Sequence, residues 1–209
     1  TGWTGAITVS AGAIRVSNSN ALGSGAVALV TPSGAKGAAL QLAGGVTIGN
    51  AINLQAVANQ PFGGIQGGGQ LQSVSGNNSV TGQLRADWDV LLSAQSGSTL
   101  NVTGGIHNGT TTARSVLFGG AGTINLGSAL TAATGTANQY YAVYKVGSGT
   151  LNLTTVNPVI PTNSLAARDG IWSFRDGGTI VGGNTIAFTV SAGATLRLDN
   201  TGSNVTNRL

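Results

Sequence analysis

The feature that most constrains the fold of this chain is internal repetition. The hexapeptide Thr-Val-Ser-Ala-Gly-Ala stands at residues 8–13 and again at residues 189–194. A second motif ends in Thr, an aliphatic residue, Asn and another aliphatic residue, and it occurs at residues 96–102, 120–126 and 147–153. Sequence periods of about 20–50 residues are typical of solenoids and other stacked repeats. The chain is therefore expected to consist of short units that stack on one another.

The units have the alternation of β-strands. Leu100 and Val102 flank Asn101, so on a strand the two apolar side chains point to one face and the amide to the other. One such strand buries little, but coils stacked about 4.8 Å apart bury a continuous apolar column. The pattern predicts a parallel β-solenoid. An antiparallel β-sandwich is the alternative, because its strands also recur every 8–12 residues or so.

Composition supports an all-β fold. Only 7% of the 209 residues are charged, 41% are hydrophobic and 35 are Gly, whereas an average soluble domain has about 25% charged residues. Glu is absent, and the abundant Gly, Thr, Val, Ser and Asn favour strands and tight turns. No apolar run approaches the roughly 18 residues of a membrane helix. We therefore expect a folded chain without membrane insertion.

We expect one β-solenoid domain over residues 1–209, with an irregular, loop-rich insertion around residues 138–176. That stretch contains all three tyrosines, Trp172 and two Arg-Asp-Gly triplets, at 168–170 and 175–177. It matches the repeats poorly, and the triplets are interpreted as turns.

The charges argue against a nucleic-acid partner. The net charge of +4 comes from nine cations scattered along the chain, and nucleic-acid binding needs a concentrated basic patch. The chain has no Cys, which fits export from the cell and excludes thiolate metal sites.

The strongest candidate for ligand contact is the triplet Asp87, Trp88 and Asp89. On a strand the two carboxylates would share a face, and carboxylates beside an indole can contact a sugar or, with a third ligand, Ca²⁺. The alternative is a solvated outer strand face with Trp88 buried. No Asp motif recurs from unit to unit, so no metal site is predicted.

Other residues give little sign of catalysis. His107 is the only histidine and precedes Asn-Gly, so we expect it in a tight turn. The glycine-rich run at residues 63–69 lacks the Lys-Ser/Thr of a phosphate loop and is expected to be a corner. No nucleophile elbow is present. We expect no cofactor and no enzymatic activity.

Residues 3–9 and 10–16, followed by Asn-Ala-Leu-Gly-Ser-Gly at 20–25, resemble the autotransporter-associated β-strand repeats of bacterial passenger domains. The Gly-x-Gly-Thr-Leu-Asn-Leu motif at 147–153 is similar to the glycine-led strands of that family. The resemblance implies a right-handed parallel β-helix, secretion, and an extracellular or bacterial cell-surface location.

Repeats without a catalytic constellation predict a structural or adhesive protein, a rigid β-helical rod that assembles end to end into filaments. Its expected partners are a second copy stacked head-to-tail or further repeats of the same chain, with surface polysaccharide as another candidate. The alternative is a carbohydrate-binding or polysaccharide-degrading β-helix. It would use Asp87, Trp88 and Asp89, with Tyr140, Tyr141 and Trp172 as further aromatic platforms.

Overall fold

A computed structural model describes residues 2–30, 37–55, 68–132, 140–157, 161–180 and 187–209. Within these ranges the regular structure consists of β-strands, with no helix. The expected all-β class is therefore confirmed for the described residues.

The strands form three long sheets and one short pair. Sheet A contains β1 (Ile7–Val9), β3 (Val27–Val30), β6 (Ile52–Gln55), β9 (Leu84–Ala86), β12 (Ile106–Asn108) and β15 (Leu130–Ala132). Sheet B contains β2 (Gly12–Val16), β4 (Ala38–Ala43), β7 (Leu71–Ser75), β10 (Val90–Ala94), β13 (Arg114–Gly120), β16 (Tyr140–Lys145), β19 (Pro161–Ala167) and β22 (Phe188–Val190). Sheet C contains β5 (Thr47–Ile48), β8 (Asn77–Val80), β11 (Thr99–Val102), β14 (Thr123–Leu126), β17 (Thr150–Leu153), β20 (Ile171–Phe174) and β23 (Thr195–Leu198). The short pair is β18 (Val156–Asn157) with β21 (Thr179–Ile180).

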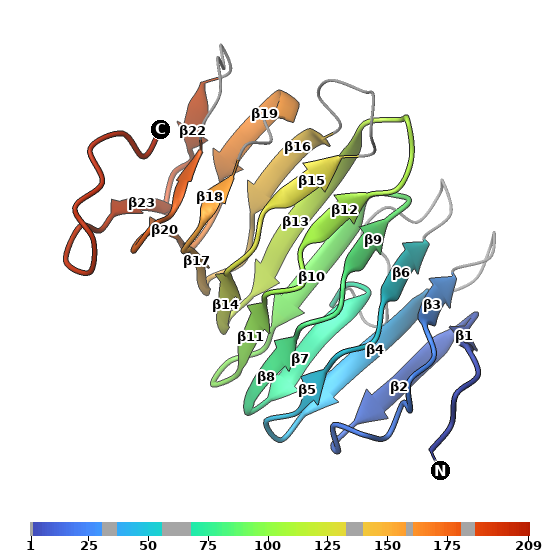
Figure 1. Cartoon of the computed structure of the whole chain (residues 1–209). Coiled ribbons are helices and arrows are strands. Elements are labelled where there is room, and N and C mark those ends of the chain that lie inside the picture. The colour runs from blue at the N-terminus through green and yellow to red at the C-terminus, as the bar shows by residue number, and fades with distance from the viewer. Residues whose placement is uncertain (1, 31–36, 56–67, 133–139, 158–160, 181–186) are drawn as a thin grey trace.

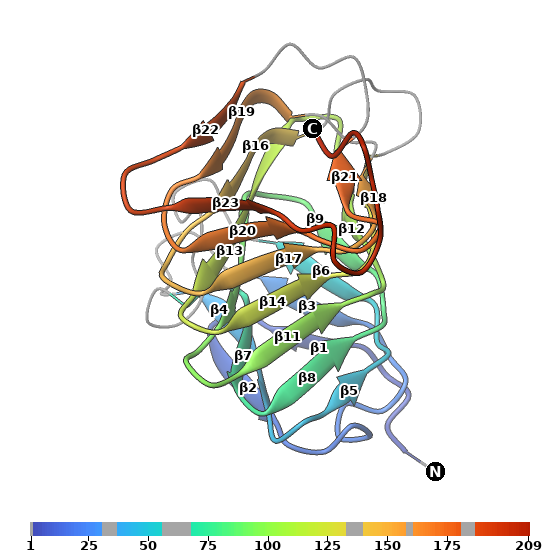
Figure 2. The ribbon, with the colours of Figure 1, turned by 90° about the vertical axis from the view of Figure 1, so that its left-hand side faces the viewer.

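All described strand pairs are parallel. The chain passes from sheet A to sheet B to sheet C and returns to sheet A one rung higher, which makes a β-solenoid (Figure 1). Seen with sheet C in front, strands run to the right as the coil rises, so the winding is right-handed (Figure 2), the usual hand for parallel crossovers. The β-sandwich alternative is wrong, because its strands would pair antiparallel.

The repeated motifs occupy the rungs that their spacing predicts. Thr99, Thr123 and Thr150 lie in register on β11, β14 and β17 of sheet C. The two copies of the hexapeptide, in contrast, form different corners. Residues 8–13 turn from sheet A into sheet B, whereas residues 189–194 turn from sheet B into sheet C. Both corners use a glycine with positive φ, 87° at Gly12 and 84° at Gly193, so one sequence encodes a strand–corner–strand element without specifying its sheet.

The core is a set of apolar columns that run along the solenoid axis. In sheet C one column contains Leu100, Ile124, Leu151 and Trp172, and all four are buried. Sheet B contributes Leu40, Leu71, Leu92 and Phe118 in register. Full burial of one aliphatic side chain contributes roughly 1.5–3 kcal/mol to stability. Because the coils stack, each of them contributes further buried side chains of this kind.

The outer face of sheet C carries a ladder of amides. The Nδ2 group of Asn101 donates to Oδ1 of Asn77 (2.6 Å), Asn125 donates to Asn101 (2.7 Å), and Asn152 donates to Asn125 (2.8 Å). Asn101, Asn125 and Asn152 lie in register, so their amides bond from coil to coil and fix the register of β11, β14 and β17. Asn77 lies two residues before Ser79, the register partner of Asn101.

The expected loop-rich insertion around residues 138–176 is wrong for the residues that the structure describes there. They contain strands β16 to β20, which pair in the same sheets as the repeats. The sequence looked irregular because aromatic residues replace aliphatic ones in the core, where Trp172 stacks on Phe174 with ring centroids 5.9 Å apart. Register shifts at Arg114/Ser115 and Tyr140/Ala142 also break the pattern. The Arg-Asp-Gly triplets do lie outside strands, as predicted.

The third side of the solenoid changes its pairing in this region. Sheet A stops at β15, where the backbone N–H of Leu130 donates to Oδ1 of Asn157 (2.7 Å) rather than to a backbone carbonyl. β18 and β21 then continue that side. Beyond β21, the backbone N–H of Ile180 donates to the carbonyl of Arg208 (2.9 Å), so the segment 199–209 folds back to supply one more rung.

Candidate functional site at the A/B edge

The solenoid has three edges, the corners at which the chain passes from one side to the next. We call the A/B edge the corner where each coil enters sheet B from sheet A or from β18 and β21. Its connections that lie wholly within the described residues are 10–11, 87–89 and 109–113. Binding residues are often carried on loops that a rigid scaffold positions. The connection 87–89 holds the predicted contact residues, so the A/B edge is the candidate ligand site.

The predicted contact residues Asp87, Trp88 and Asp89 lie on this edge. They connect β9 to β10, so they form a corner and not part of a strand as expected. The two carboxylates consequently do not share a face. A β-strand alternation was the wrong geometry for them, because the coil changes direction between Ala86 and Val90.

Both carboxylates are occupied by internal contacts. Asp87 accepts from Nε of Arg85 through Oδ1 (2.7 Å) and from Nε2 of Gln55 through Oδ2 (3.1 Å). Asp89 accepts from the backbone N–H of Ser115 through Oδ1 (2.6 Å). The bonds from Gln55 and Ser115 connect successive coils, the bond from Arg85 lies within one coil, and together they hold the corner in place.

Trp88 is half-buried, and the guanidinium of Arg114 lies over its ring, 4.1 Å from the centroid. Arg114 opens β13 at the register shift, and its buried Nε has no hydrogen-bond partner within the described residues. A β-bulge re-aims the side chain at that position. Sequence reasoning missed Arg114, because it is separated from Trp88 by one coil.

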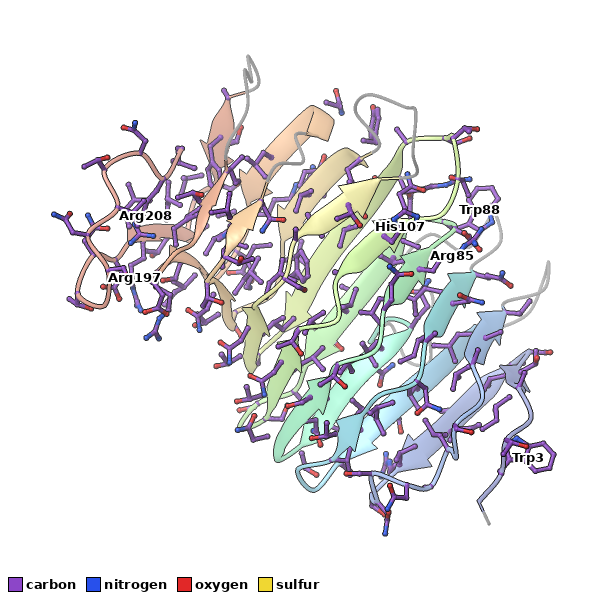
Figure 3. All side chains as sticks on the ribbon, in the orientation of Figure 1. Trp3, Arg85, Trp88, His107, Arg197 and Arg208 are labelled. Carbon is purple, nitrogen blue, oxygen red and sulfur yellow. The ribbon has the colours of Figure 1, made fainter. Side chains whose placement is uncertain are left out.

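Arg85 and His107 lie next to each other on the outer face of sheet A, in register on β9 and β12. Figure 3 shows both on the same side of the molecule as Trp88. Arg85 also donates from Nη2 to the carbonyl of Gly109 (3.1 Å), and Nδ1 of His107 lies 3.2 Å from Oγ1 of Thr131. His107 was expected in a turn; it belongs instead to strand β12.

The other aromatic candidates do not join this site. Tyr140 is buried, and its hydroxyl donates to the carbonyls of Ile106 or Thr131, 3.0 and 3.1 Å away. Burial raises the pKa of the Tyr140 hydroxyl, with the backbone of Asn108 opposing. Trp172 is a core residue, and Tyr141 is exposed. Tyr140 and Trp172 therefore cannot be sugar platforms, which corrects that part of the carbohydrate hypothesis.

An unexpected buried amine lies inside the solenoid. Lys145 occupies the core column of sheet B between Phe118 and Ala167, and it is 1% exposed. Its Nζ donates to the carbonyls of Val146 (2.8 Å), Gly147 (2.5 Å) and Asp169 (3.3 Å). Burial lowers the pKa of Lys145 to about 8, although the charge of Asp169 opposes the shift. The three carbonyls use all its donors, so its role is to close a corner.

The described residues contain no group of three or more His, Asp or Glu side chains placed to hold a metal ion. They also contain no helix of the length and apolarity that a membrane span requires. The predicted glycine-rich corner lies outside the described residues at positions 63–67, and only Gly68 and Gly69 can be placed.

Comparison of the chain with protein-family models finds no match, and comparisons with curated proteins and with solved structures find none either.

Proposed function

We propose that this chain is a structural and adhesive protein, a rigid β-helical rod displayed outside the cell or on a bacterial cell surface. The observation that carries the proposal is the continuity of the apolar columns and the Asn ladder from coil to coil. Such a stack resists bending, because every coil is bonded to both neighbours over three sides. The resemblance to autotransporter repeats, the absence of Cys and the low charge support the location.

We also propose that the solenoid stacks end to end with further β-coils, because apolar side chains are exposed at both of its ends. Val190 and Leu198 belong to core-facing columns but are 45% and 55% exposed. At the opposite end Ile7 and Ile14 are only partly buried. Edge strands with apolar side chains pair readily with another strand. Further repeats of the same chain, or a second copy stacked head-to-tail, would cover these faces.

Analytical ultracentrifugation over a range of protein concentrations tests the stacking of copies. We expect a concentration-dependent series of elongated species, shifted towards monomer by Leu198→Asp. The control Tyr141→Asp changes a similarly exposed side chain (50%) on β16, which lies inside sheet B and away from both ends of the stack. If the unmodified chain is a monomer at all concentrations, head-to-tail stacking of copies is excluded. Further repeats of the same chain would then be the remaining way to cover the apolar ends.

A second function, carbohydrate binding, is favoured by the convergence of Trp88, Arg85 and Arg114 on the A/B edge. An aromatic ring with adjacent polar groups is a common way to bind sugars. We propose it as the adhesive activity of the rod, without cleavage, because the carboxylates of Asp87 and Asp89 already take part in bonds between coils. Polysaccharide binding that is lost in Trp88→Ala but kept in Trp3→Ala, an exposed indole elsewhere, is the expected result.

A further inference from the structure

We propose that the Arg114–Trp88 pair on the A/B edge is a recognition site for an acidic polysaccharide, one that carries carboxylate or sulfate groups. The inference rests on the adhesive part of the proposed function and names its ligand class.

The hydrogen-bond inventory of the edge favours an acidic ligand. Both oxygens of Asp87 and Oδ1 of Asp89 receive hydrogen bonds from the protein. Arg85 is held by Asp87 and by the carbonyl of Gly109. Arg114 has neither an ion-pair partner nor a hydrogen-bond acceptor within the described residues, and its Nε is buried. An acidic group of a ligand would supply the acceptor that this guanidinium lacks there.

The guanidinium of Arg114 is also pre-oriented. It lies over the Trp88 ring, 4.1 Å from the centroid, and this contact restricts its movement. The planar fork of a guanidinium matches the two oxygens of a carboxylate or sulfate. Side chains that are ordered before binding lose less entropy when the ligand arrives. Asp89, close in sequence to Trp88, reduces the local positive charge, so a single free anion would bind weakly.

A polymer suits the site better than a single anion. The A/B edge runs along the solenoid axis, and Arg85 and His107 occupy successive rungs beside the Arg114–Trp88 pair. A chain with a charge on each sugar can place one group at Arg114 and extend along the edge past Arg85 and His107.

The test is equilibrium binding of the 209-residue chain to polygalacturonate, to fully methyl-esterified polygalacturonate and to dextran sulfate. We expect binding to polygalacturonate that weakens as salt is raised and falls at least tenfold on esterification, which removes the charge but keeps the sugar. The affinity for dextran sulfate, compared with that for polygalacturonate, shows whether the site prefers sulfate or carboxylate groups. Equal binding to the esterified polymer would overturn the proposal.

Protein variants locate the site. Arg114→Gln should weaken binding at least tenfold, and Arg114→Lys should weaken it severalfold, because a lysine keeps the charge but not the planar fork. The matched control is Arg197→Gln, which removes an exposed cation from sheet C and should change affinity less than twofold. Circular dichroism establishes that each variant is folded, and the esterified ligand tests the proposal without any variant. Loss of binding in Arg197→Gln but not in Arg114→Gln would refute the assignment. The stacking of the rod is measured separately, by ultracentrifugation, and does not depend on this result.

Discussion

The side-chain amide of Asn125 donates a hydrogen bond to Oδ1 of Asn101, 2.7 Å away and one coil earlier. Asn125 accepts the equivalent bond from Asn152, so the inner amides of the ladder, Asn101 and Asn125, are both donors and acceptors. The bonds run parallel to the solenoid axis and are available only when the coils are in register. The ladder therefore specifies register as well as adding stability.

Replacing Asn125 with Ala should break two of these bonds. Each net hydrogen bond is worth about 0.5–1.5 kcal/mol, so we expect the free energy of unfolding to fall by roughly 1–3 kcal/mol in urea titrations. Asn53→Ala is the matched control, because Asn53 is half-buried on the outer face of sheet A and has no side-chain partner in the described part of the chain. An equal loss in both variants would contradict the ladder as the cause.

Gly149 lies where two coils approach closely. A Cβ at this position would be 2.1 Å from the carbonyl oxygen of Gly122 on the preceding coil, and neither backbone can move without disturbing sheet C. Gly149→Ala should lower the free energy of unfolding by about 2 kcal/mol or more. Gly127→Ala, whose Cβ would meet its nearest neighbours at an ordinary 3.5 Å, should cost much less. Similar thermal midpoints for the two variants would refute this close contact.

Lys145 predicts a dependence of stability on pH. Its pKa is lowered to about 8 in the folded state by burial, while an unfolded lysine titrates near 10.4. Between these values the unfolded chain binds more protons, so stability should rise as pH increases from about 8 towards 10. The comparison is the slope of unfolding free energy against pH for the unmodified chain and for Lys145→Met, which should lack this rise. Equal slopes would show that the Lys145 amine titrates normally.

Arg208 anchors the folded-back segment 199–209. Its guanidinium donates to the carbonyls of Gly178, Asp176, Asp199 and Ser203 and to Oδ1 of Asn200. Arg208→Gln should remove most of these bonds and release the segment, measured as faster hydrogen exchange of residues 199–209. Arg175→Gln, an exposed residue paired with Asp176, should leave that exchange unchanged. Fast exchange in the unmodified chain would contradict the anchoring.

The sequence predicted the parts of the fold that repeat. The Thr-x-Asn-x motif placed Leu100 and Val102 in the core and Asn101 on the outer face, because alternation along a strand is a local property. It could not tell which sheet each copy of the hexapeptide enters, since that depends on how many strands precede the corner in the coil.

The residues that were missed are those that break the alternation. Asn78 and Lys145 occupy core-facing positions because their polar atoms bond to corner backbone: Asn78 accepts from the N–H groups of Gly45 and Val46. The pairing of Arg114 with Trp88 was equally invisible, because it joins residues 26 positions apart through a register shift. The sequence indicated Asp87, Trp88 and Asp89 as the candidate site, and the structure adds Arg114 while both carboxylates accept hydrogen bonds within the protein.

The direction of the hydrogen bonds has a mechanical consequence. The bonds between coils run along the axis, and the two ends of the described chain lie at opposite ends of the stack (Figure 1). A pull on those ends loads the coils in series, so they detach one at a time instead of shearing together. Successive rungs such as Thr99 and Thr123 are 24 residues apart, and each coil that peels away releases about 80 Å of extended chain. A rod of this design would lengthen stepwise under tension and absorb work, keeping its outermost attachment while the coils below it yield.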